Sequence, residues 1–153
     1  AVGRILEGED AKLCAQSLIK SDSPQWRQAG FALLGEIEDG EGAFGAAIYS
    51  YTKAMEEPCV TESLAKVALR LGVLEVRGGD SKKAEKALKK AIELNAANGE
   101  ARAEAYLTLA RASLMRNDVE SARAYATVVT ALFDKTKFAA EAEKILKENS
   151  EER

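Results

Sequence analysis

The sequence of 153 residues contains no histidine, which removes the commonest general base and metal ligand of proteins. Its two cysteines, Cys14 and Cys59, are too few for a disulfide framework or for a zinc site, which needs four nitrogen or sulfur ligands. No nucleophile, base and orienting group fall in a recognisable pattern, so the residues give no argument for an enzyme. We expect no catalytic residue, no cofactor and no metal, and we interpret the cysteines as small buried or near-surface thiols rather than redox centres.

Long apolar runs and excess positive charge are missing as well. No stretch of about 18 apolar residues occurs, so we expect no segment to insert into a membrane. The net charge is -3, which provides no overall basic field for nucleic acid. Aromatic residues make up only 6% of a chain that is 46% hydrophobic. That balance fits small residues packed between helices better than one large aromatic core.

A spacing pattern recurs three times along the chain. In the middle copy Leu71-Gly72 precedes a turn at Gly79-Asp80, and Ala84, Leu88 and Ala91 follow. The flanking copies keep these spacings, with Leu34-Gly35, Gly42-Ala43, Ala47, Tyr51 and Ala54 upstream, and Leu109-Ala110, Asn117-Asp118, Ala122, Ala126 and Val129 downstream. The period is 37 and then 38 residues. Fixed periodicity of this length is typical of a stacked helical repeat.

Apolar periodicity, turn residues and caps predict an all-α fold of about eight helices without a sheet. We expect caps at Ser23, at Asp80 or Ser81, and at Thr136. The predicted helices cover residues 9–20, 24–38, 43–55, 62–77, 81–94, 100–116, 119–133 and 137–148.

The sequence predicts an incomplete repeat at the N-terminus and a capping helix at the C-terminus. Residues 9–20 have the spacing of the second helix of a repeat, whose first helix is missing or reduced to Val2–Leu6. The last helix has one apolar face and one polar face, which suits the end of a solenoid. Because the chain opens at Ala1 without an initiator Met, we expect it to be the C-terminal end of a longer array or multidomain protein.

These repeats resemble the tetratricopeptide repeat (TPR), a helix-turn-helix unit of about 34 residues with the pattern W-x2-L-G-x2-Y, then A-x3-F, then P. The resemblance covers roughly residues 27–133. It implies a right-handed superhelix of antiparallel helix pairs, an α-solenoid. The implied division is a partial N-terminal repeat over residues 1–22, repeats over 23–58, 59–97 and 98–134, and a capping helix with a tail over 135–153.

The chain departs from the family pattern at several positions. The residue three after the glycine, usually tyrosine, is Glu38, Glu75 and Ser113 in the three copies, and the proline is displaced to Pro58 in the first and absent later. The period is similar to that of repeats in bacterial cell-envelope proteins of this superfamily. That similarity points towards the bacterial cytoplasm or periplasm.

The resemblance also implies where a partner would bind, because the first (A) helices of TPR repeats line a concave groove. The residues implied to face a partner are Glu36, Lys66, Leu69, Val73, Val76, Arg77, Glu104, Leu107, Arg111 and Leu114. Members that clamp the C-terminal carboxylate of chaperones carry Lys and Asn where this chain has Ala32 and Glu36, so that clamp is absent. An apolar strip with a charged rim suits an amphipathic helix or an extended apolar peptide.

Two interpretations of this strip stay open, since apolar spacing is the same for a groove and for packing between adjacent A helices. The first is a non-enzymatic scaffold that binds a protein or peptide in the groove. The second is a structural or assembly subunit, or a regulatory domain, of a larger and envelope-anchored protein, packed against other parts of it. Repeat folds serve many partners, so the fold does not choose between them.

Three other motifs have a functional and a plain interpretation. Gly40–Gly45 matches G-x-G-x-x-G, but a dinucleotide site needs a preceding strand, and we interpret the glycines as a turn. A phosphate-binding face is the alternative to a solvated outer face for Lys82, Lys83, Lys86, Lys89 and Lys90, which Glu85 and Glu93 interrupt. The acidic cluster of Glu36, Glu38, Asp39 and Glu41 is interpreted as surface.

Overall fold

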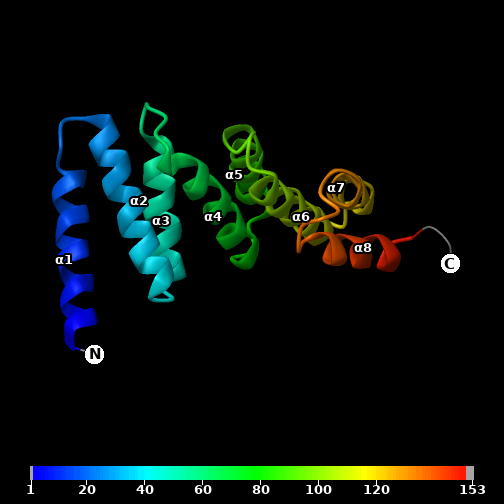
Figure 1. Ribbon diagram of the computed structural model, residues 1–153, viewed down its shortest axis with the longest axis horizontal. Coiled ribbons are helices and arrows are strands. Elements are labelled where there is room, and N and C mark those ends of the chain that lie inside the picture. Colours follow the sequence, from blue (N-terminus) through cyan, green and yellow to red (C-terminus); the bar gives the residue numbers. More distant parts are fainter. Residues whose placement is uncertain (1, 151–153) are drawn as a thin grey trace. The chain divides into compact units, whose positions relative to one another are not determined.

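The computed structural model describes the backbone of residues 2–150 and the side chains of residues 7–150. Within these residues the chain forms eight α-helices and no strand (Figure 1), which confirms the all-α prediction. The helices are α1 (Val2–Ile19), α2 (Pro24–Gly40), α3 (Phe44–Glu56), α4 (Ser63–Arg77), α5 (Ser81–Leu94), α6 (Gly99–Met115), α7 (Val119–Leu132) and α8 (Ala139–Glu148). They group into two compact units, unit 1 over residues 1–68 and unit 2 over residues 69–153, so α4 begins in one and ends in the other.

The first helix and two of the predicted caps differ from expectation. Because α1 is continuous from Val2, the segment predicted as a separate remnant is part of it. Ser23 makes no side-chain cap bond. The Thr136 hydroxyl donates to the carbonyl of Phe133 at 2.7 Å, and α8 begins later than predicted. The cap at Asp80 is confirmed, since its carboxylate accepts the N–H of Lys83 at 3.0 Å.

The turn inside each repeat has the same geometry in all three copies. A residue with positive φ follows the A helix, with φ of 78° at Gly42, 86° at Gly79 and 59° at Asn117. The next N–H then donates to the carbonyl five residues earlier, from Ala43 to Glu38 at 2.8 Å, Asp80 to Glu75 at 2.9 Å and Asp118 to Ser113 at 2.9 Å. This is the Schellman arrangement that ends a helix through a left-handed residue. The sequence period is therefore a structural period.

In unit 1, two glycines let α2 approach its neighbours on two sides. A Cβ at Gly35 would lie 2.6 Å from the ring of Tyr51 on α3. A Cβ at Gly30 would lie 2.8 Å from the Cβ of Leu18 on α1. Real side chains do not approach so closely, so both helix pairs depend on a residue without a side chain.

A fully buried glutamine fastens α2 to the segment that joins α3 to α4. Gln28 is 0% exposed, and its Nε2 donates to the carbonyls of Ala54 and Cys59 at 3.0 Å each. Its Oε1 accepts the N–H of Thr61 at 3.1 Å and the Thr61 hydroxyl at 2.6 Å. The side-chain amide thus uses both donors and both acceptor positions, so its burial leaves no unpaired polar group.

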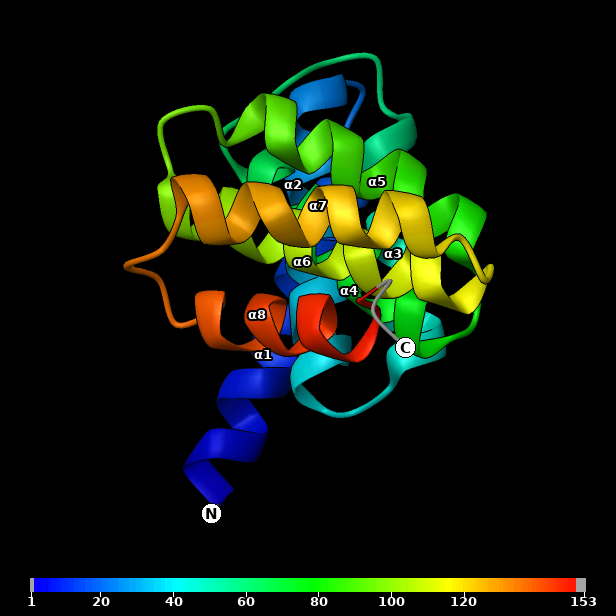
Figure 2. The same cartoon turned by 90° about the vertical axis from the view of Figure 1, so that its right-hand side faces the viewer.

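Unit 2 repeats the glycine contact and adds a second core. The Gly72 backbone lies against the side chain of Leu88, which is 0% exposed and would overlap any added Cβ. α6 and α7 contact each other, and α8 lies beside α7 at the C-terminal end of the unit (Figure 2). The buried residues that these three helices share are Leu107, Ala110, Ala126, Val129, Ala142 and Ile145.

One carboxyl group is buried in unit 2 without the partner that its repeat equivalent has. Glu38 accepts a hydrogen bond from the hydroxyl of Ser50. Glu75 takes the same place in the next copy and is 6% exposed, but the counterpart of Ser50 there is Ala87, which has no hydroxyl to donate. Burial raises the pKa of Glu75, because removing water disfavours the ionised form.

We expect Gly72→Ala to lower the free energy of unfolding by about 1–3 kcal/mol, because its methyl group must displace Leu88 from a packed core. Gly45→Ala is the matched control. Gly45 lies within α3 with open space around it, so alanine there should stabilise the protein by about 0.5–1 kcal/mol. Chemical denaturation of the two variants measures both values. Equal effects would contradict the close contact at Gly72.

We expect Glu75→Gln to raise the melting temperature at pH 7 and to have no effect near pH 4. Burial is the main cause of the raised pKa of Glu75, Asp80 adds to it, and Lys83 opposes it. A raised pKa in the folded state favours folding below the ordinary value of 4.5, and that stability is lost as pH rises through the raised value. Thermal melts of both proteins across this pH range test the effect. A difference in melting temperature between the two proteins that does not change with pH would contradict this prediction.

Candidate protein-binding surface

The ten residues predicted to face a partner fall in both units. Glu36 on α2 and Lys66 near the start of α4 belong to unit 1, and both are exposed. The other eight belong to unit 2, on the later part of α4 and on α6.

The apolar part of the surface lies on α4. Leu69, Val73 and Val76 are spaced four and three residues apart, so they share one face of the helix, and all three are half-buried. Leu71 and Leu74 are 6% and 1% exposed, so they belong to the core. We call Leu69, Val73 and Val76 the α4 strip. It keeps part of its apolar area exposed to solvent.

On α6 the predicted surface is partly covered by the chain itself. Leu107 is 1% exposed and packs in the core with Ala142 and Ile145 of α8. Leu107 is therefore core in this structure, and a partner cannot contact it while α8 is in place. Sequence spacing did not reveal this, because the residues that cover Leu107 lie more than thirty positions later.

The other residues predicted on α6 have mixed surroundings. Arg111 forms an ion pair with Glu141 of α8, so its charge is already compensated. Leu114 is half-buried against the same core as Leu107, and Glu104 is half-exposed. The part of the predicted surface that remains open in unit 2 therefore centres on the α4 strip, with the exposed Arg77 after it.

The basic stripe on α5 has the character of a solvated outer face. Ala84, Leu88 and Ala91 fill the buried side of this helix, while most of its lysines are exposed. Lys89 binds Glu85 at 2.7 Å, and hydrogen bonds from Lys89 and then from Arg116 lower the pKa of Glu85. Lys83 and Lys90 also have acidic neighbours, Asp80 at 3.8 Å and Glu93 at 3.6 Å, so acidic groups offset part of the positive charge of the stripe.

The other motifs have structural explanations as well. A helix and not a strand precedes the glycine motif, and the turn interpretation is confirmed for Gly42, whereas Gly40 ends α2 and Gly45 lies within α3. In the acidic cluster, Glu38 is bound by Ser50, and Glu41 pairs with Lys12 at 2.8 Å. Both cysteines are free thiols, Cys14 exposed and Cys59 half-buried.

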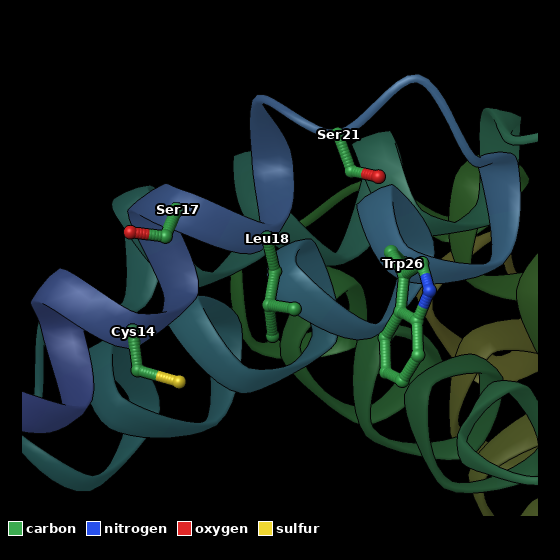
Figure 3. Close-up of a pocket in the computed structure, with 5 residues that line it drawn as sticks. All are labelled: Cys14, Ser17, Leu18, Ser21 and Trp26. Atoms are coloured by element: carbon green, nitrogen blue, oxygen red, sulfur yellow. The ribbon is translucent and has the colours of Figure 1, made fainter.

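Unit 1 contains a depression that the sequence analysis did not single out. It measures about 310 Å³ and is lined by Cys14, Ser17 and Leu18 of α1, by Ser21 in the turn, and by Trp26 of α2. In Figure 3 the Leu18 side chain lies between the Cys14 thiol and the Trp26 ring. Trp26 is 59% exposed and is the only tryptophan of the chain. The one available signal was a tryptophan near a helix start, which is equally typical of core.

No group of histidine, cysteine, aspartate or glutamate side chains among the described residues could hold a metal ion. Likewise, no described helix combines the length and apolarity that crossing a bilayer requires. Comparison of the chain with protein-family models and with curated proteins gives no match.

Proposed function

We propose that this chain is a TPR-like repeat protein that acts as a non-enzymatic scaffold and binds a peptide or a partner helix on the A-helix surface of its repeats. The proposal rests on a repeated architecture and on one exposed apolar feature.

The recurrence of local geometry supports a repeat of this kind. The left-handed residue and the bond five residues back occur at the same place in each copy. A glycine of the A helix meets a large B-helix residue in two copies, Gly35 with Tyr51 and Gly72 with Leu88. Close approach of paired helices through small residues is what a TPR-like pair requires.

The α4 strip is the observation that carries the binding proposal. It is a line of aliphatic side chains on one helix face, partly exposed, with the charged Lys66 before it and Arg77 after it. Such a line suits a partner that offers Leu or aromatic anchors on one face, as amphipathic helices and extended apolar peptides do.

We expect Val73→Glu to reduce peptide binding by at least about tenfold, because a carboxylate in the α4 strip would have to be desolvated under an apolar partner. The assay is selection of a displayed peptide library on the full chain, followed by titration of the selected peptides against both proteins. Leu69→Lys should act in the same direction.

Val119→Glu is the control, since Val119 is 41% exposed at the start of α7, away from the A-helix surface. Circular dichroism of all variants separates loss of binding from loss of fold. If Val73→Glu unfolds the chain, the α4 strip is core and the proposal fails. Unchanged binding in a folded Val73→Glu protein would equally contradict it.

A further inference from the structure

The depression between α1 and α2, which we call the α1–α2 groove, lies outside the α4 strip. It lies wholly within unit 1 and is formed by residues 14–26. Three of its features bear on what it binds: the helix face that it leaves open, its apolar floor and the charge at its edge.

The open face of α1 corresponds to a face that another helix covers elsewhere in the same unit. Ala11, Ala15 and Leu18 of α1 have the spacing of Ala47, Tyr51 and Ala54 of α3. Cys14 then takes the place of Ser50, which is 2% exposed beneath α2. Cys14 is exposed. Ala15 is 0% exposed, so α1 leaves only part of this face, at Cys14, open to solvent where α3 receives a helix.

The floor of the groove is apolar and large enough to anchor such a helix. Leu18 and Trp26 form its apolar lining, and Leu13, which is not part of the lining, is 61% exposed on α1. An exposed tryptophan beside aliphatic side chains is the type of residue that dominates binding energy when a partner covers it. Side-chain hydroxyls of Ser17 and Ser21 border the floor.

The edge of the groove is acidic. Glu7 lies seven residues before Cys14 and so shares its stripe on α1, and Asp10 lies four residues before Cys14. Both carboxylates are exposed.

Two basic side chains of these helices, Lys12 and Arg27, are bound to other partners, and Lys20 is exposed directly after α1. Lys12 pairs with Glu41 at 2.8 Å, and Arg27 pairs with Glu57 at 2.9 Å. An apolar floor with an acidic edge is complementary to a helix that has an apolar face flanked by lysine or arginine.

We propose that the α1–α2 groove binds a basic amphipathic helix of a partner protein. The apolar face of that helix covers Leu18 and Trp26, and its basic residues lie against Glu7 and Asp10. This surface is separate from the α4 strip, so either proposal can fail without the other.

Trp26 allows a direct test on the full chain, because its fluorescence reports on this groove alone. The probe is a synthetic amphipathic helix with leucine and alanine on one face and lysine along both edges. Matched peptides carry glutamate for every lysine, or the same residues in permuted order. We expect only the lysine peptide to shift Trp26 emission to shorter wavelength, and we expect its binding to weaken at about 1 M salt, where charges are screened beyond about 3 Å.

Charge reversals locate the site. Glu7→Lys with Asp10→Lys should weaken binding of the lysine peptide by at least about fivefold. Glu9→Lys is the control for each single reversal, because Glu9 is exposed on another face of the same turn and the change in net charge is equal. Val73→Glu should leave the Trp26 shift unchanged. In a Cys59→Ser protein Cys14 is the only thiol. The bound peptide should slow the reaction of the Cys14 thiol with a thiol reagent.

Several results would overturn the proposal. One is an equal shift of Trp26 emission with the glutamate peptide, which would show that binding does not depend on charge. An equal shift with the permuted peptide would show that it does not depend on an amphipathic helix. Another is equal weakening by Glu9→Lys and Glu7→Lys, which would show general attraction to an acidic chain. A shift that appears on concentrating the protein without peptide would identify a second copy as the occupant. No shift with any peptide would show that the groove binds no helix.

Discussion

The structure depends on how closely its helices can approach one another, and in two of the three copies glycine sets that distance. At Gly35 and Gly72 a large side chain of the next helix occupies the space where a Cβ would be. Dispersion and burial then act between a backbone and a whole side chain rather than between two side-chain tips. Such a contact is short-ranged and directional. Small changes at these glycines therefore alter the packing of a whole helix pair, which is why the same spacing recurs in sequence.

Much of the fold could be predicted because it is encoded locally. Periodicity, turn residues and the Asp80 cap placed seven of the eight helices to within two residues. The failures have physical causes. The sequence predicts a first helix over residues 9–20, but α1 begins at Val2. No cap or turn signal before residues 2–6 marks that start. Thr136 was taken for a cap because its hydroxyl suits that role, whereas it bonds back to Phe133.

The candidate site was less predictable, because exposure is decided by contacts between distant parts of the chain. Leu69 and Leu107 occupy the same position in successive copies, yet Leu69 is half-buried and Leu107 is core. The difference is α8, which covers Leu107 and neutralises Arg111 through Glu141. The groove beside Trp26 was missed for the same reason. Spacing shows that residues share a face, but it does not show what lies opposite that face.

The two linkers between repeats differ in a way that bears on how the protein can be engineered. In residues 57–62 the backbone is fastened to α2 by the fully bonded amide of Gln28, so any inserted residue would break that set of bonds. Residues 96–98 are all exposed between α5 and α6. An epitope, a fluorescent domain or a protease site can therefore be grafted into the second linker, whereas an insertion into the first would disturb its hydrogen bonds to Gln28.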